Sequence, residues 1–378
     1  MLAGVVTTVG PPTAAMRRVQ QAVSSCGGVL VVAGDRKGPE KFDLPDAVFL
    51  GLRDQLEGPF ELARRLPTDH YARKNIGYLE AVRRGATFLY ETDDDNAPLD
   101  AWAPRSEEVS GARTIPPPSA FQHFSVSAFS QKWVNVYRCF TDDPHIWPRG
   151  FPLEQIRASA SAFPAPRPRG APDSHASLPN QASPQASLLC PSAYSVVPIC
   201  SPIQQGLVNG SPDVDAVWRL TQDRPFTFDH RPPVWLAPGQ WCPFNTQSTW
   251  WWPAAFPLLY VPSHCSFRMC DIWKSFVAQR CLWAMGLGVV FHPPEVVQDR
   301  NPHDVLKDFE AEVPGYLWNA RIARLLGALE LDAAPEAVGE NLRVCYRALV
   351  GEGILPTDEL PLLDAWLSDL AAIKENRG

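Results

Sequence analysis

The sequence predicts an α/β fold built around a mostly parallel central sheet. Three observations predict it. Strand and helix signals alternate through the first hundred residues, an apolar globular pattern returns after residue 203, and a run of aspartates directly follows an expected strand. Alternation of this kind favours parallel strands, because right-handed crossover connections that join them are usually helices. Ligands of such sheets bind at the carboxyl ends of the strands, so a functional site is expected there.

The first hundred residues contain the clearest elements. The expected strands are the apolar runs at residues 4–8, 29–33, 47–50 and 87–90. The expected helices are residues 12–23 and 69–84. Gly85 follows the second helix and is a typical helix stop. The fourth strand leads directly into the aspartate run, which is therefore expected at the carboxyl edge of the sheet.

The remainder of the chain divides by composition. Residues 158–201 are rich in Ala, Ser and Pro and lack periodicity, so we expect a disordered insertion that buries too little apolar surface to offset chain entropy. After it, a helix is expected over residues 271–285, a strand over 289–291, and helices from residue 316 onward. The expected parts of the chain are residues 1–157, 158–201, 202–312 and a helical 313–378.

Charge and composition exclude some classes of protein. A formal net charge of -7 and a pI near 5.7 argue against a nucleic-acid partner, because such proteins usually present a basic face. No apolar run reaches the ~20 residues of a membrane helix, and the N-terminus lacks a signal-peptide pattern. The nine cysteines contain no CxxC pair, so no zinc or redox motif is evident.

Tryptophan is unusually frequent, with 13 residues in the chain and a concentration within residues 241–252. Indole rings present large apolar faces, and we expect this stretch to stack on a sugar. The alternative is that most of these tryptophans fill the core.

The aspartate run, Asp93 to Asp95, is the first candidate site. Three adjacent carboxylates repel one another and are tolerated when a divalent cation neutralises them. Mg²⁺ and Mn²⁺ take oxygen ligands, often one or two carboxylates together with substrate phosphates. Successive side chains at a strand end point in different directions, so two of the three carboxylates can face such an ion while one braces the site. The alternative is a solvated acidic turn or a helix cap.

Arg73, Lys74 and Asn75 begin the helix that precedes the fourth strand. Helix N-termini favour anions, and the fork of an arginine matches phosphate oxygens. These three residues are therefore candidates for a diphosphate site. An ordinary basic surface turn is the alternative.

Two further residues are candidates for catalysis. Arg149 stands in a segment with two prolines and a glycine, which restrict the backbone and suit recognition of phosphate or carboxylate. Asp271 begins an expected helix, where a carboxylate is either a cap or a catalytic base. For Arg149, the alternative is an exposed residue in a structural loop.

These segments together resemble the STELLO family of glycosyltransferase-like proteins. The resemblance is carried by LPTDHYARKNIGYLEAVRRGATFLYETDDDN, NVYRCFTDDPHIWPRGFPLEQI, QQGLVNGSPDVDAVWRLT, APGQWCPFNTQSTWWWPAAFPLLYVP and CDIWKSFVAQRCLWAMGLGVVFHPP. The segment WPRGFPL is the most telling. A more remote similarity runs to the reversibly glycosylated polypeptides, which are UDP-sugar mutases. The resemblance implies a GT-A fold, which is a Rossmann-like unit with an acidic motif that holds a divalent metal against the diphosphate of a nucleotide-sugar.

The resemblance also implies roles for parts and residues. Residues 1–157 would form the nucleotide-sugar-binding half and residues 202–312 the acceptor-side half. Arg149 falls where the mutases carry an arginine that becomes glycosylated, and Asp271 falls at an acceptor-side acid. By position in the family, Asp93 and Asp95 would be the metal ligands. The expected nucleotide-sugar-binding residues are Thr7, Asp35, Arg73, Lys74, Asn75, Asp93 and Asp94.

The leading hypothesis is a glycosyltransferase that depends on Mn²⁺ or Mg²⁺ and transfers a sugar from a nucleotide-sugar, expected to be UDP-linked, to a glycan or other acceptor. Asp271 and Arg149 would be catalytic. One alternative is a non-catalytic relative that scaffolds a glycan synthase complex, and another is a UDP-sugar mutase. The resemblance implies a Golgi location, although the chain itself shows no transmembrane segment.

Overall fold

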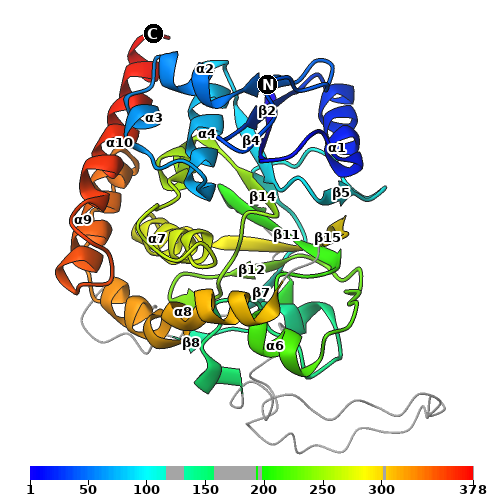
Figure 1. Cartoon of the computed structure of the whole chain (residues 1–378). Helices are drawn as coiled ribbons and strands as arrows, with labels where there is room; N and C mark the ends of the chain where they lie inside the picture. The colour runs from blue at the N-terminus through cyan, green and yellow to red at the C-terminus, as the bar shows by residue number, and fades with distance from the viewer. Residues whose placement is uncertain (116–131, 157–192, 195–197, 301–303, 378) are drawn as a thin grey trace, which may run out of the picture.

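The computed structural model describes residues 1–115, 132–156, 193–194, 198–300 and 304–377 (Figure 1). Its centre is an eleven-stranded sheet. In order across the sheet, the strands are β3 (Val48–Leu50), β2 (Val29–Ala33), β1 (Leu2–Thr7), β4 (Phe88–Thr92), β14 (Ser248–Trp251), β11 (Ile203–Gly210), β15 (Val289–Gln298), β12 (Val234–Leu236), β7 (Arg113–Ile115) and β9 (Ala193–Tyr194). Strand β5 (Asn96–Pro98) pairs with β15 outside this order.

The described helices lie around this sheet. They are α1 (Ala14–Ser25), α2 (Leu52–Glu57), α3 (Glu61–Arg65), α4 (Lys74–Arg83), α6 (Ala216–Thr221), α7 (Cys270–Ala284), α8 (Val305–Gly327), α9 (Val338–Gly351) and α10 (Glu359–Glu375). The short elements are η1 (Tyr71–Arg73), η3 (Val136–Phe140), η4 (Pro253–Leu259), η5 (Pro335–Ala337), and the two-residue strands β6 (Glu108–Val109), β8 (Lys132–Trp133), β10 (Ile199–Cys200) and β13 (Gln240–Trp241).

Strand directions bring several chain ends to one edge of the sheet. Strands β3, β2, β1 and β4 run parallel, so their carboxyl ends lie together. Strand β14 is antiparallel to β4, and its first residue, Ser248, lies opposite Thr92 at the end of β4. Strand β11 is antiparallel to β14 and parallel to β15, which places Gly210 opposite Gln298. The carboxyl ends of six strands and the loop before β14 therefore share this edge.

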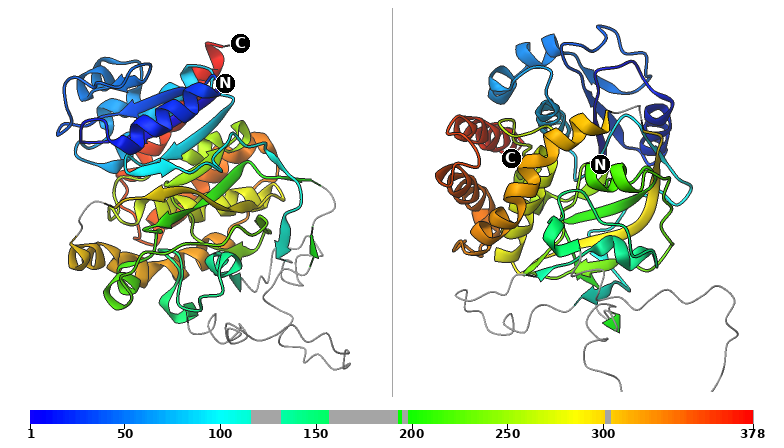
Figure 2. Two further views of the ribbon diagram at one scale, coloured as in Figure 1. Left: turned by 90° about the vertical axis from the view of Figure 1, so that its right-hand side faces the viewer. Right: turned by 60° about the horizontal axis from the view of Figure 1, so that its bottom comes forward.

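Two apolar cores lie on the two faces of the sheet. Successive side chains of β1 alternate between them, as expected for a strand: Ala3 and Val5 join the core under α4 and α7, whereas Leu2 and Val6 join the core under α1. Figures 1 and 2 show α1 on one face and α4 and α7 on the other. This double covering explains why the strands read as continuous apolar runs.

The C-terminal helices α8, α9 and α10 lie outside α7 and extend back to the N-terminal half (Figures 1 and 2). Asp369 of α10 accepts hydrogen bonds from the backbone N–H groups of Glu61 and Leu62, both at 2.9 Å, and so caps α3. The expected boundary between residues 312 and 313 falls inside α8, which is a continuous helix.

The α/β class and the mostly parallel sheet are confirmed, and several elements match their expected bounds closely. The helix expected over residues 69–84 begins later, because Asp69 has a φ of 55°, in the left-handed region that interrupts a helix. The expected strand at 289–291 continues to Gln298. Most of the expected insertion, residues 157–192 and 195–197, lies outside the described residues.

The expected C-terminal boundary of the insertion, residue 201, needs correction. Strand β9 pairs with β7, and strand β10 pairs with β6. Residues before 202 therefore take part in strand pairing, and the insertion is not irregular up to residue 201 as expected. The apolar residues near 199 supply the reason, since Ile199 packs against a small core with Val109 and Val290.

Candidate functional site

A cavity of about 390 Å³ lies at the carboxyl edge of the sheet. Some lining residues are acidic and come from the loops after β2, α3 and β4. Others come from the segments after β11 and β15 and before α7. We call these the acidic wall, which carries Asp35, Asp69, Asp93, Asp94 and Asp95, and the arginine wall, which carries Asp213, Arg219, Arg268 and Arg300. A cavity of this size, lined by charged groups of both signs, is typical of a small-molecule site.

Asp93 is held by two donors, one from η1 and one from the start of α4. The Lys74 ammonium donates to Asp93 Oδ1 at 2.9 Å, and the Tyr71 hydroxyl donates to the same oxygen at 2.7 Å. Lys74 is fully buried, and it also donates to the Thr92 carbonyl at 2.8 Å. The structure thus places Lys74 behind the acidic wall, where it orients Asp93 instead of lining the cavity.

Asp94 is tied to the first strand. Thr8 Oγ1 donates to Asp94 Oδ2 at 2.6 Å, and the Thr13 hydroxyl donates to the Asp94 backbone carbonyl. Burial raises the pKa of the Asp94 carboxyl above its ordinary value, although the bond from Thr8 opposes this. These contacts join the aspartate run to the end of β1 and the start of α1.

Asp95 has an oxygen that is buried and unpaired. Gln298 Nε2 donates to Asp95 Oδ2 at 2.9 Å, whereas Asp95 Oδ1 has no hydrogen-bond partner among the described residues. Burial, reinforced by the neighbouring charge of Asp93, raises the pKa of Asp95 to about 7. A divalent cation would satisfy this oxygen and neutralise the repulsion, so the residues present fit a metal ion.

The number of protein ligands available to such an ion is small. Within the described ranges, no three His, Cys, Asp or Glu side chains converge as a ready ligand set. Mg²⁺ and similar ions are commonly held by one or two carboxylates and completed by substrate phosphates and water. The acidic wall therefore suits a cation that arrives with a phosphorylated ligand.

The other expected nucleotide-sugar-binding residues divide into two groups. Thr7 and Asp35 line the cavity. Asp35 accepts from the backbone N–H groups of Arg36 at 2.7 Å and His70 at 2.9 Å, which orders the loop after β2. These two residues remain candidates for ligand contact.

Arg73 and Asn75 require a correction. Both are buried, with exposures of 1% and 0%, and neither lines the cavity. Arg73 Nη1 donates to the Ala63 carbonyl at 2.7 Å, and the Asn75 side chain makes a paired contact with the Val261 backbone at 2.8 and 2.9 Å. The turn of η1 into α4 directs both side chains into the interior, so they support the site without touching a bound nucleotide there.

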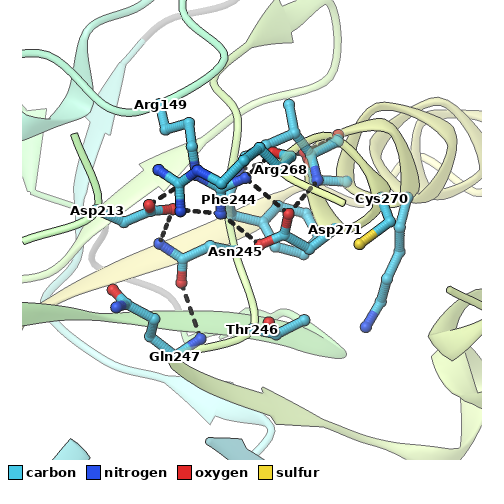
Figure 3. Close-up of polar contacts among 12 residues, drawn as sticks. Arg149, Asp213, Phe244, Asn245, Thr246, Gln247, Arg268, Cys270 and Asp271 are labelled. Atoms are coloured by element: carbon cyan, nitrogen blue, oxygen red, sulfur yellow. Dashed lines mark hydrogen bonds and ion pairs between the residues drawn. The ribbon is translucent and has the colours of Figure 1, made fainter. Parts of the chain in front are cut away.

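Arg149 lies between two carboxylates (Figure 3). Its Nε and Nη2 donate to the two oxygens of Asp213 at 2.7 and 2.9 Å, and Nη1 and Nη2 donate to the two oxygens of Asp271 at 2.9 and 2.6 Å. Nη1 also donates to the Arg268 carbonyl. A guanidinium has five N–H groups, so all of its donors are used.

This arrangement, the Arg149 clamp, fixes the charge of its members. Burial alone would lower the pKa of Arg149, but the charges of Asp213 and Asp271 reverse this and hold it well above its ordinary value. Burial likewise opposes ionisation of Asp213, yet Arg149 lowers the pKa of that carboxyl below its ordinary value. The clamp is thus a buried, fully hydrogen-bonded ion cluster.

The expected catalytic roles of Arg149 and Asp271 need correction in this light. Neither residue lines the cavity, and both are buried. Asp271 Oδ1 also accepts from the Ile272 backbone N–H at 3.0 Å. The N-cap residue of α7 is Met269, so Asp271 lies in the first turn of the helix and is not its cap. Asp213 is the clamp carboxylate that faces the cavity. Sequence reasoning missed it, although the Pro-Asp-x-Asp segment was a signal.

The tryptophan expectation is also wrong for residues 241–252. Trp241, Trp250, Trp251 and Trp252 are at most 6% exposed and belong to the cores. The aromatic side chains that line the cavity within the described residues are Tyr71 and Phe267, and Phe267 is 57% exposed. A single phenylalanine in a loop gives no periodic signal, which is why the sequence did not indicate it.

Comparison with known proteins gives a consistent result. The family model described as STELLO glycosyltransferases matches residues 268–376. The protein of Arabidopsis thaliana named "Probable glycosyltransferase STELLO1" is 26% identical over 357 residues, which is 92% of this chain and 42% of the relative. These matches support a STELLO-type family assignment. The family resemblance drawn from the sequence is thereby confirmed.

A second STELLO protein of the same plant, named "Probable glycosyltransferase STELLO2", is 28% identical over 276 residues, or 71% of this chain and 32% of the relative. The chain spans less than half the length of the curated relatives it matches. In the described part of the chain, no helix has the length and apolar character of a membrane span.

Proposed function

We propose that this chain is a metal-dependent glycosyltransferase of GT-A type, and that its donor is a UDP-linked sugar. The observation that carries the proposal is the acidic wall, where Asp95 presents a buried unpaired oxygen beside Asp93 at the carboxyl edge of the sheet. The names of the matched relatives, which describe glycosyltransferases, support it independently.

Mn²⁺ or Mg²⁺ is the cofactor in this proposal, with Asp93 and Asp95 as its protein ligands. Such an ion, when bound, stabilises the negative charge of the departing nucleoside diphosphate. Lys74 is a positioning residue, because its ammonium donates to Asp93 Oδ1 at 2.9 Å and so fixes the orientation of that carboxylate. Gln298 has the same role for Asp95 Oδ2.

Asp213 replaces Asp271 as the acid proposed to meet the acceptor. It faces the cavity, and Arg149 keeps its carboxyl ionised, so its role is to accept a hydrogen bond from an acceptor hydroxyl and orient it. Asn245 Nδ2 donates to Asp213 Oδ2 at 2.9 Å and restrains the carboxylate further. A carboxyl with a lowered pKa is a weak base, and orientation is therefore its main contribution.

The test combines binding and turnover. UDP binding to the intact chain is measured by calorimetry with and without Mn²⁺, and UDP-sugar hydrolysis is followed in parallel. We expect Mn²⁺ to strengthen UDP binding, and we expect Asp95→Asn to remove that effect. Asp100→Asn is the matched control, because Asp100 is an exposed carboxylate outside the cavity. Equal metal dependence in wild type and Asp95→Asn contradicts the proposal.

The mutase alternative has weaker support. A sugar adduct on Arg149 needs a free guanidinium nitrogen, whereas all five of its N–H groups are engaged in the clamp. Membership of a glycan synthase complex and a Golgi location remain predictions from the family resemblance, and a pull-down and microscopy of the tagged chain test them. The acceptor is proposed to be a glycan without further specification.

A further inference from the structure

Three arginines of the cavity have no role in the function proposed above. Arg219 comes from α6, Arg268 lies just before α7, and Arg300 follows the end of β15. All three line the arginine wall. Arg219 and Arg268 are about 50 residues apart in the sequence, and Arg268 and Arg300 are about 30 apart. The fold therefore brings three guanidinium groups from distant segments to one small cavity.

Two of the arginines have carboxylate partners on α8. Arg300 Nη2 lies 2.6 Å from Asp308 Oδ2, and Arg268 Nη2 lies 2.7 Å from Glu312 Oε1. Glu312 is fully buried and Asp308 nearly so. These carboxylates stand behind the arginines, so they hold the two guanidinium groups in place along the wall.

Arg219 differs from the other two. Its Nη2 donates to the Pro212 carbonyl at 2.8 Å, but its Nε has no hydrogen-bond partner among the residues that the structure describes. Arg219 is only 8% exposed. A buried N–H donor without a partner is costly, and a ligand oxygen in the cavity would remove that cost.

The charges of the wall also favour an anion. Burial lowers the pKa of Arg219 to about 10, and the positive charge of Arg300 adds to this effect. Burial also lowers the pKa of Arg300, and the positive charge of Arg268 lowers it further. The three groups are therefore close enough to repel one another. The remaining carboxylate of the wall, Asp213, is already bound through both oxygens by Arg149.

We propose that Arg219, Arg268 and Arg300 form a subsite for a phosphate-type oxyanion of the substrate. Arginine forks match phosphate oxygens and retain their charge when partly buried. The wall adjoins the acidic wall, because Gln298, which holds Asp95, lies two residues before Arg300. The source of the oxyanion rests on the proposed function: it is either the diphosphate of the donor or a phosphate on the acceptor.

The first experiment tests the subsite without any nucleotide or metal. Inorganic pyrophosphate is titrated into the intact chain by calorimetry in the presence of EDTA. We expect wild type to bind it, and Arg219→Gln and Arg300→Gln each to weaken binding about ten- to hundredfold, the usual effect of losing a charge-assisted contact. Arg321→Gln is the matched control, because Arg321 pairs with Glu352 on the surface away from the cavity.

Two outcomes overturn the subsite. One is that pyrophosphate does not bind wild type, and the other is that the two cavity variants bind it as tightly as wild type and Arg321→Gln do. Melting temperatures without ligand check that each variant is folded. If Arg219→Gln fails to fold, Arg300→Gln decides, since its side chain is less buried than that of Arg219 within the wall.

A second experiment identifies the source by comparing uridine, UMP and UDP. If the donor diphosphate occupies the subsite, Arg219→Gln weakens UDP binding and leaves uridine binding unchanged. If an acceptor phosphate occupies it, UDP binding is unchanged and pyrophosphate still binds at saturating UDP. Failure of UDP to bind while pyrophosphate binds contradicts the proposed function and leaves the subsite standing, whereas the reverse result contradicts only the subsite.

Discussion

The acidic wall and the Arg149 clamp are built in opposite ways. The acidic wall takes Asp93, Asp94 and Asp95 from one tripeptide after β4, and their charges are left partly uncompensated. The Arg149 clamp assembles from residues up to 122 positions apart in the sequence, and its charges are closely paired. Buried groups without a partner, as on the acidic wall, indicate ligand binding, whereas the fully paired groups of the clamp indicate a scaffold.

The family model begins at Arg268, a residue of the arginine wall, and continues through α7 to α10. Those helices also support the loop that leads to this wall. Glu359 of α10 accepts a hydrogen bond from the Tyr260 hydroxyl at 2.6 Å and from the His264 backbone N–H at 2.9 Å. The helical C-terminal part therefore positions one wall of the cavity from a distance.

The largest effect is expected from a substitution that breaks the Arg149 clamp. Arg149→Met leaves Asp213 and Asp271 buried without their counter-charge, and we expect a loss of about 3–5 kcal/mol in the free energy of unfolding. On the acidic wall, Asp95→Asn removes a carboxylate with an unpaired oxygen and should change stability by less than about 1 kcal/mol. Urea denaturation measures both. Similar losses in the two variants would contradict the contrast between the acidic wall and the clamp.

An intermediate effect is expected at the glycine that follows Arg149. Gly150 has a φ of +87°, and a Cβ there would lie 2.4 Å from Ile272 Cγ2 of α7. We expect Gly150→Ala to cost about 2–4 kcal/mol, from backbone strain and overpacking together. Gly111→Ala is the matched control, because Gly111 has a φ of +68° with nothing within 4 Å, so only the strain of about 1–2 kcal/mol applies.

The same measurement includes a rescue. Ile272→Ala removes the side chain that the new methyl group meets, so the double variant should be more stable than the sum of the two single losses predicts. Strict additivity would show that the close approach to α7 is not what requires glycine at this position.

The smallest effect concerns the acidic wall. Thr8→Val keeps the shape of the side chain but removes the 2.6 Å hydrogen bond to Asp94. We expect a loss of about 1 kcal/mol in stability, a typical net value for one hydrogen bond, and weaker Mn²⁺-dependent UDP binding. Thr221→Val is the control, because the Thr221 hydroxyl bonds only carbonyls of its own helix. Unchanged UDP binding in Thr8→Val would show that Asp94 needs no anchoring.

Much of the fold was predictable from short-range patterns. The apolar strands, the helix that became α7 and the aspartate run at a strand end all appear where the sequence indicated. The direction of individual side chains was less predictable. Arg73 and Asn75 begin a helix in the sequence, but whether they face a ligand or the interior depends on how η1 turns against Val261 and Ala63.

By itself, the sequence determined the alternating α/β pattern, the acidic run at the carboxyl edge and the family resemblance, because each depends on neighbouring residues. Only the tertiary structure decided that Asp213 instead of Asp271 faces the cavity, that Arg149 is fully paired, and that three distant arginines share a wall. The physical reason is that pairing and burial of a charge depend on which chain segments the sheet brings together, and no local pattern encodes that.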